Sequence, residues 1–253
     1  MAWRAIVCAV ALAACGRIGF SGEGNDAPAT DGGSGDGLTP MLDCTSTHPG
    51  ALLCSGFEQD DMGGWDYTVI DEGSVTLSTA RAYRGAKSLE IQTTGADAYK
   101  YARWGKNYVL PQVSSGDIYL RGYYWMSSTT IVTHQLSIMV VGNAIDPFPS
   151  AFVMLAPAEI NAVLTDAPTT TASFEFPRDR WACLLLHIAV GVSGTVEVFV
   201  DGTRVLSRNN FDTRVNGGYT NVEQGVHYAT PEQSASHFWI DEVVLDTSPV
   251  TCD

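Results

Sequence analysis

The sequence predicts an all-β fold, a two-sheet antiparallel β-sandwich of the jelly-roll type, on three observations. After Pro40 the chain consists of short runs of alternating apolar and polar residues, separated by Gly, Pro, Asn and Asp. Val, Ile, Thr, Tyr and Phe fill these runs, and no window keeps a helical period for three turns. Ten or more such runs favour a sandwich or jelly roll over a helical or mixed fold.

The expected strands follow one another from residue 51 to the end of the chain. The pair Asp201-Gly202 stands between alternating apolar residues, which is a strong hairpin signal. The predicted strands are Ala51–Glu58, Ser74–Ser78, Ser88–Gln92, Ile118–Met126, His134–Val141, Ala151–Leu155, Asn161–Thr165, Ala182–Val190, Thr195–Val200 and His237–Leu245.

The first residues of the chain have the pattern of an export signal. Arg4 precedes the uncharged apolar run Ala5–Leu12, and two alanines then lead to Cys15. A cysteine at this point resembles the signal of bacterial lipoproteins, in which it becomes the lipidated N-terminus. The alternative, a membrane-spanning anchor, needs about 20 apolar residues, more than this run provides. We expect a signal peptide over 1–14, a lipid on Cys15 and an exported, membrane-anchored protein. By resemblance to enterobacterial sorting, Gly16 favours the outer membrane or cell surface.

Charge and composition divide the remainder of the chain and exclude one class of partner. Residues 15–42 are rich in Gly, Ser, Asp, Ala and Pro, which predicts a disordered linker, and residues 43–253 form the predicted globular domain. Without Arg4 the mature chain has 13 basic residues against 28 acidic ones. No cluster of Lys and Arg offers a phosphate-binding face, so nucleic acid is excluded and any membrane contact depends on the lipid. We expect a monomer.

Several motifs, in order, resemble the concanavalin A-like lectin and glucanase class, including laminin-G-like and carbohydrate-binding modules. They are Phe57-Glu58 with Gly63-Gly64-Trp65, the step Ala82-Tyr83-Arg84-Gly85-Ala86-Lys87-Ser88-Leu89, Arg180-Trp181-Ala182-Cys183, Val196–Gly202 and Phe238–Leu245. The resemblance covers about residues 51–250 and implies a jelly roll. It does not define an activity, because this fold carries lectins, hydrolases, lyases and adhesion modules.

Four cysteines remain after the signal, and an exported chain favours two disulfides. If the first and last strands pair antiparallel, their register carries Cys44 towards Cys252. This favours Cys44–Cys252 with Cys54–Cys183. The alternative, a local loop closed by Cys44 and Cys54, stays open.

Glycoside hydrolysis is disfavoured, because the strands contain no pair of carboxylates spaced to flank a scissile bond. Asp241 and Glu242 are adjacent and point to opposite faces, and Glu197 stands alone on its strand. A polysaccharide lyase needs a base and a group that neutralises a uronate carboxylate. The residues that could serve are Arg121, Tyr123, His134, Gln135, His187 and Tyr228.

One predicted strand indicates a sugar-binding groove. Tyr119, Arg121, Tyr123 and Trp125 alternate on one face of Ile118–Met126, where rings could stack on sugars and the arginine could pair with a carboxylate. Gln135, opposite in parity to its apolar neighbours, and His187 complete the predicted groove. The alternative is that these aromatic residues only pack a half-buried face.

The resemblance also implies a structural calcium ion near the paired terminal strands, and we expect no other cofactor. Glu58 and Asp241 would supply carboxylates, and backbone carbonyls of Gly85–Lys87 would complete the six to eight oxygen ligands. The alternative is an ordinary pair of solvated acids.

Three functions fit the sequence. The leading one is a surface lipoprotein whose jelly roll binds polysaccharide without catalysis, so that no residue is assigned a catalytic role. The second is a lyase acting on a uronate-containing glycan. The third is a structural or adhesion lipoprotein with a protein partner.

Overall fold

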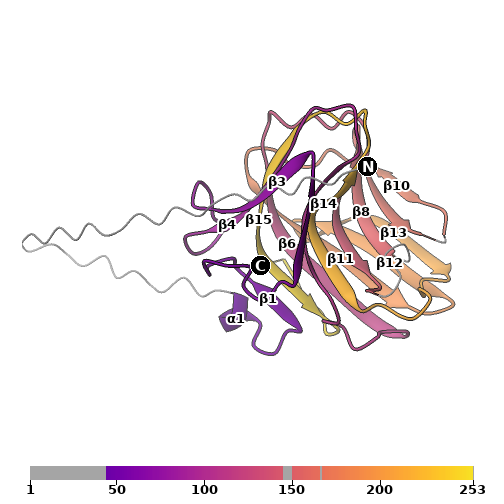
Figure 1. Ribbon diagram of the computed structural model, residues 1–253. Coiled ribbons are helices and arrows are strands. Elements are labelled where there is room, and N and C mark those ends of the chain that lie inside the picture. Colours follow the sequence, from indigo (N-terminus) through magenta and orange to yellow (C-terminus); the bar gives the residue numbers. More distant parts are fainter. Residues whose placement is uncertain (1–43, 145–149, 166, 253) are drawn as a thin grey trace, which may run out of the picture. The chain divides into compact units, whose positions relative to one another are not determined.

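The computed structural model describes residues 44–144, 150–165 and 167–252, which contain one four-residue helix and fifteen strands (Figure 1). The elements are α1 (Cys44–Thr47), β1 (Leu53–Ser55), β2 (Tyr67–Asp71), β3 (Gly73–Ser78), β4 (Ser88–Thr93), β5 (Lys100–Lys106), β6 (Gly116–Met126), β7 (Leu136–Gly142), β8 (Ser150–Ala156), β9 (Glu159–Leu164), β10 (Thr170–Ser173), β11 (Trp181–Val190), β12 (Gly194–Val200), β13 (Thr203–Phe211), β14 (Asn221–Ala229) and β15 (Ser236–Asp246).

Two antiparallel sheets form the sandwich. Sheet A has the order β13-β12-β11-β6-β15-β4-β3, and β1 pairs with one end of β15. Sheet B has the order β10-β9-β8-β7-β14-β5-β2. The chain crosses repeatedly between the sheets, so that β14 lies between β5 and β7, and β15 lies between β4 and β6. The predicted all-β sandwich is confirmed.

The core lies between the sheets and follows the period of two. In β6 the side chains of Ile118, Leu120, Tyr124 and Met126 face inward and are fully buried. The Tyr124 hydroxyl donates a hydrogen bond to the side-chain carbonyl of Gln224 in the opposite sheet, which satisfies both polar groups inside the core. The outer face of each sheet is the face turned away from this core.

The sequence reading missed several strands of sheet B. β2, β5, β10 and β14 were not predicted, and β13 was foreseen only at its first residues. The predicted first strand, residues 51–58, is reduced to Leu53–Ser55, although its antiparallel pairing with the last strand is present. β5 and β14 mix apolar residues with Gly, Lys, Asn or Glu, which weakens the strand signal, whereas the short strands β2 and β10 have strand-like compositions and were not recognised.

The favoured disulfide pairing is wrong. Cys44 is bonded to Cys54, the local loop that had been the alternative, and Cys183 is bonded to Cys252. The register argument assumed that the chain before β1 continues as a strand. Instead α1 turns the chain back, with the amide of His48 donating to the carbonyl of Cys44, and this places Cys44 beside Cys54.

Predictions for the start of the chain lie outside the described residues. These are the signal peptide over 1–14, the lipid on Cys15 and the linker over 15–42. Among the residues that the structure describes, no helix has the length and hydropathy needed to span a membrane.

Candidate functional site

The predicted groove residues of β6 share the outer face of sheet A, but that face is covered. Arg121 is completely buried, and its Nη1 donates to the backbone carbonyl of Thr251 at 2.9 Å. The Tyr123 ring is 4% exposed and stacks on the Tyr83 ring at a centroid separation of 3.7 Å. The residues after β15 and the loop before β4 therefore occupy the place predicted for a sugar.

The other two members of this row also have protein partners. The Arg81 guanidinium lies over the rings of Trp125 and Trp239, at 4.3 Å and 4.9 Å from their centroids. The Tyr119 ring stacks on the His187 ring at 4.3 Å. The sequence alternation correctly placed these side chains on one face, yet the face is a packed layer of rings and cations and does not form the expected groove.

His187 is held between two carboxylates on this same face. Its Nδ1 lies 3.0 Å from Glu197 Oε2, and its Nε2 lies 2.8 Å from Asp117 Oδ1. Both ring nitrogens thus have acceptors, which leaves His187 no nitrogen for a ligand or for proton transfer.

Gln135 does not join Arg121, because the two belong to different sheets. Gln135 immediately precedes β7 in sheet B, whereas Arg121 lies in β6 of sheet A. His134, a further lyase candidate, is in the same loop, where its Nδ1 lies 2.7 Å from the Thr230 hydroxyl. The parity argument failed because it treated consecutive strands as neighbours in one sheet.

The predicted calcium corner has the wrong polarity for a cation. The Glu58 carboxylate accepts the amide N–H groups of Ala86 and Lys87, and Asp241 Oδ2 accepts those of Tyr83 and Arg84. The loop thus turns N–H donors towards the acids, where calcium would need carbonyl oxygens. The described residues contain no cluster of three or more His, Cys, Asp or Glu suited to a metal. The arrangement does not fit the expected ligand set, and calcium binding stays a prediction.

The outer face of sheet B carries an open cavity of about 310 Å³. It exists because one row across the strands has small side chains: Asn221 of β14 lies opposite Gly142 of β7, which lies opposite Ser150 of β8. The further lining residues are Tyr67, Arg103, Asn107, Val140, Asn143, Ala144, Glu223 and His227. The cavity therefore combines carboxylate, imidazole, guanidinium, phenol and amide groups on one face.

Glu223 is the centre of the polar side of this cavity. Its Oε1 accepts the Tyr67 hydroxyl at 2.6 Å, and its Oε2 lies 2.9 Å from Arg103 Nε. Oε2 also bonds Nδ1 of His227. Arg103 in turn donates from Nη1 to the backbone carbonyl of His227 at 2.7 Å. The carboxylate and the guanidinium together fix the imidazole, and among the described residues no hydrogen bond involves its Nε2.

Two glycines allow Tyr67 and His227 to reach Glu223. A Cβ on Gly105 would lie 2.1 Å from the Tyr67 ring, so its absence lets that ring cross β5 and reach Glu223 on β14. Gly225 has φ +109°, and the pairing of β14 with both neighbours is irregular after it. In a regular strand residues i and i+4 lie about 13 Å apart. The bulge bends β14, which brings Glu223 and His227 into contact.

Electrostatics keep the central carboxylate ionised. Burial alone would raise the pKa of Glu223, but the hydrogen bond and charge of His227, followed by Arg103 and Tyr67, outweigh burial and lower that pKa below its usual value. Burial, reinforced by the Glu223 charge, raises the pKa of Tyr67 far above its usual range. Tyr67 therefore keeps its proton, and Glu223 remains an acceptor that orients its neighbours.

One polar oxygen among the residues that line the cavity has no hydrogen-bond partner. The side-chain carbonyl Oδ1 of Asn221 is buried and accepts no hydrogen bond from the described residues, and the residue is only 7% exposed. A buried acceptor without a donor costs free energy, about 1–3 kcal/mol. Asn221 lines the cavity, so this polar side chain stands beside any ligand bound there.

An apolar strip continues the cavity across sheet B. Val140, Phe152 and Met154 cluster on the outer face, with Val163 and Tyr228 packed against them. Pairing places Glu223 opposite Val140, and Val140 opposite Phe152, so the polar cluster and the strip form one row across β14, β7 and β8. Tyr228, named earlier as a lyase candidate, bonds through its hydroxyl to Met154 Sδ at 3.2 Å and contributes its ring to the strip.

The sequence did not reveal the polar cluster of Tyr67, Arg103, Asn221, Glu223 and His227, because these residues lie on β2, β5 and β14, which were not predicted. A signal was present: in β14 the residues Asn221, Glu223 and His227 alternate with the buried Val222 and Val226. The period of two, applied to polar side chains, would have placed the three on one face.

Comparison with known proteins gives a likeness of fold. No family model matches the sequence, and no curated protein matches it. The solved structures include an endo-β-1,4-glucuronan lyase from the fungus Trichoderma reesei, with a TM-score of 0.61, 15% identity, and coverage of 78% of this chain and 96% of that one. The cellulose-induced protein Cip1 gives 0.59 at 14% identity, covering 79% and 100% of the two chains. The T. cruzi calreticulin globular domain gives 0.54 at 13% identity, covering 79% and 88%.

These likenesses and the strand order define the class of fold: a jelly-roll β-sandwich. At such low identity they carry the fold alone.

Proposed function

We propose that this protein binds a polysaccharide across the outer face of sheet B, with the cavity at Asn221 and Glu223 as the central binding point. The observation that carries the proposal is the cavity lined by Asn221, Glu223 and His227 beside an apolar strip. A sugar ring offers hydroxyl donors at its rim and an apolar C–H face, so it fits both features at once.

The row of residues also matches a chain ligand better than a compact one. The polar cluster and the strip extend over neighbouring strands, from Tyr67 on β2 through Glu223 on β14 to Phe152 on β8. Successive sugar units can follow this row. The named neighbours support the proposal, since one acts on glucuronan and another is induced by cellulose.

The proposal places the domain outside the cell, with Cys15 as the lipidated residue and residues 15–42 as the tether. Replacing Cys15 with Ser should move the protein from the membrane fraction to the soluble fraction and remove the lipid mass. Unchanged fractionation and an unchanged mass would contradict the anchor and leave the binding proposal intact.

A glycan array tests binding, followed by affinity electrophoresis on the glycans retained. Asn221→Ala and Phe152→Ala should each weaken retention about fivefold or more, because a hydrogen bond or a stacking contact is worth about 1 kcal/mol or more. Arg81→Ala, on the outer face of sheet A, is the matched control and should retain glycan fully. Loss in the control alone, or no retained glycan at all, would contradict the proposal and favour a protein partner.

A second candidate function is a lyase that cleaves a uronate-containing glycan by β-elimination. The Glu223–His227 pair favours it, because Glu223 fixes Nδ1 and leaves Nε2 of His227 as the base. Nε2 would take the C5 proton of the uronate, the C4–O bond would break to form a C4–C5 double bond, and the imidazolium would return its proton to the leaving oxygen. Glu223 would stabilise the imidazolium between these steps.

The absorbance of unsaturated uronate products separates the two candidates. His227→Asn keeps an N–H close to the position of Nδ1 and removes Nε2, so it should reduce turnover at least 100-fold while glycan retention persists. Tyr119→Phe, which alters only a hydroxyl on the outer face of sheet A, is the matched control. Retention of uronate glycans with no product from the unmodified protein would exclude the lyase and leave the binding function.

A further inference from the structure

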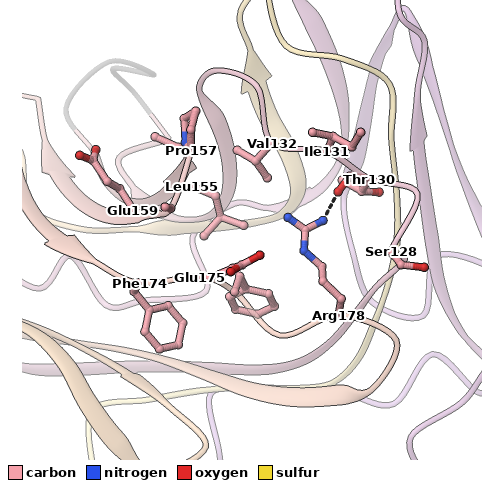
Figure 2. Close-up of a pocket in the computed structure, with 13 residues that line it drawn as sticks. Ser128, Thr130, Ile131, Val132, Leu155, Pro157, Glu159, Phe174, Glu175 and Arg178 are labelled. Carbon is pink, nitrogen blue, oxygen red and sulfur yellow. Dashed lines mark hydrogen bonds between the residues drawn. The ribbon is translucent and has the colours of Figure 1, made fainter.

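A second cavity, of about 350 Å³, is drawn in Figure 2. It lies at the other end of β7 and β8 from the cavity of sheet B. The loop after β6, the turn between β8 and β9, and the segment before β11 line it. Its walls include Val132, Leu155 and Phe174, and Ile131 stands at its rim with 63% of its surface exposed. The volume and the apolar walls are in the range of small-molecule sites.

Arg178 supplies a cation to this apolar cavity. Figure 2 shows its guanidinium directed between Thr130, Val132 and Leu155. One nitrogen, Nη1, donates to the backbone carbonyl of Thr130, and no other hydrogen bond of this side chain occurs among the described residues. Burial lowers the pKa of Arg178, against the nearby charges of Glu175 and Asp179, which raise it.

Within the described part of the chain, no carboxylate lies within 4.0 Å of this guanidinium. Five other arginines do have such partners: Arg84 with Glu242, Arg103 with Glu223, Arg180 with Asp201, Arg204 with Glu197, and Arg214 with Asp212. Asp179, the adjacent acid, instead accepts the amide of Ser128 at 2.9 Å. A half-buried cation without a close anion is costly, so an anion from outside the chain would be stabilised there.

The surroundings limit the charge of that anion. Glu159 and Glu175 line the same cavity and are exposed at its edge. Their charges would repel a phosphate or a polyanionic glycan, whereas a single carboxylate reaching Arg178 avoids most of this repulsion.

We propose that this cavity binds a small amphipathic monocarboxylate, whose carboxylate pairs with Arg178 and whose apolar body packs against Val132, Leu155 and Phe174. The site is separate from the proposed glycan site, because its residues lie at the opposite ends of β7 and β8. Glycan binding and carboxylate binding should therefore be independent.

Isothermal titration of the full chain with 3-phenylpropanoate, hexanoate and 3-phenylpropan-1-ol tests this assignment. The alcohol has the same apolar body as the first acid without its charge. Saturable binding of at least one acid is expected, with 3-phenylpropanoate at least tenfold tighter than the alcohol. No saturable binding of either acid, or equal affinity for 3-phenylpropanoate and the alcohol, would overturn the proposal.

Two substitutions locate the site. Arg178→Gln should weaken acid binding at least tenfold and leave the alcohol unchanged, whereas Phe174→Ala should weaken both. Arg180→Gln, two residues away and paired with Asp201, is the control and should bind as the unmodified protein does. Unchanged acid affinity in Arg178→Gln would overturn the proposal. If Arg178→Gln does not fold, two measurements still test the proposal. They are acid binding by Arg178→Lys and the difference in affinity between the acid and the alcohol for the unmodified protein.

Discussion

The two outer faces of this sandwich are both rich in aromatic and charged side chains, but on sheet A these side chains pack under other segments, whereas sheet B keeps a cavity among them. On sheet A, the residues after β15 lie over Arg121, and Tyr83 from the loop before β4 lies on Tyr123. On sheet B, a cavity remains beside Glu223. The difference shows that the residue types on a strand do not by themselves define a binding site. The segments that pack over the strand must also be known.

The stability of the packing on the outer face of sheet A should depend on the disulfide that holds the C-terminal residues over it. Cys183 of β11 is bonded to Cys252, 69 residues later, beyond the last strand. Cys252→Ser with Cys183→Ser should lower the free energy of unfolding by about 4 kcal/mol in the loop-entropy account. The Cys44–Cys54 bond closes a separation of 10 residues and should contribute about 3 kcal/mol.

Urea unfolding of the two double variants, under non-reducing conditions, measures both effects. Glycan retention by the folded fraction should be unchanged in each, because neither bond touches sheet B. A loss of retention in the Cys183→Ser, Cys252→Ser variant would mean that the two faces are coupled, contrary to the comparison.

Arg121 should behave as a structural residue. Arg121→Met keeps an apolar stem of similar length but leaves the Thr251 carbonyl without its donor, so we expect a loss of about 3 kcal/mol of unfolding free energy. Arg208→Met, at the exposed strand β13, is the control and should change stability by about 0.5 kcal/mol or less. If Arg121→Met unfolds at the same temperature as the unmodified protein but no longer retains glycan, the result would support the sugar-binding groove that was predicted on sheet A.

The loop over Tyr123 should give the protein a pH dependence through Asp241. Burial raises the pKa of Asp241 to about 8, against backbone N–H groups of Arg84, Tyr83 and Glu242, which lower it. In the unfolded chain the value is near 3.8. Between these values the folded state holds a proton that the unfolded state releases, so the free energy of unfolding should fall as pH rises, by about 1.4 kcal/mol per pH unit.

Urea unfolding at intervals from pH 5 to pH 8 measures this slope. Asp241→Asn cannot ionise and should flatten it, even if its absolute stability is lower. The same slope in the variant would assign the pH dependence to another group.

The smallest effect on stability is expected at the cavity of sheet B. Asn221→Ala removes a buried acceptor that has no donor, so unfolding free energy should change by about 1 kcal/mol or less, with an increase as acceptable as a decrease. Glycan retention should nevertheless fall, as stated above. A destabilisation of about 3 kcal/mol, measured by thermal unfolding, would show that Asn221 is structural, like Arg121.

The sequence was sufficient for the fold class and for the distribution of side chains along β6. Period-two alternation placed Tyr119 and Arg121 on one face and Leu120 on the other, as the structure has them. It could not show that the residues around Thr251 return over that face, because a loop's path depends on tertiary contacts. Nor could it show that β6 belongs to sheet A and β7 to sheet B. This difference separates Gln135 from the predicted groove.

The candidate site escaped detection for a related reason. Its members come from β2, β5 and β14, which are distant in sequence, and only pairing brings Tyr67, Arg103 and Glu223 together. The alternation of Asn221, Glu223 and His227 was readable, but a bulge at Gly225 decides that the last two touch. Bulges of this kind leave a weak trace in sequence, here a single glycine.

Tyr67 reaches Glu223 across the intervening strand β5. The absence of a side chain at Gly105 on that strand therefore has a large effect on the cavity. A methyl group there would meet the end of the phenol ring, which can swing aside, and would not meet a rigid backbone. An alanine at 105 should therefore yield a soluble, well-folded protein whose Glu223 has lost one of its three side-chain partners. In a library randomised at this codon, selection for solubility would accept many residues, and selection for the working site would return glycine.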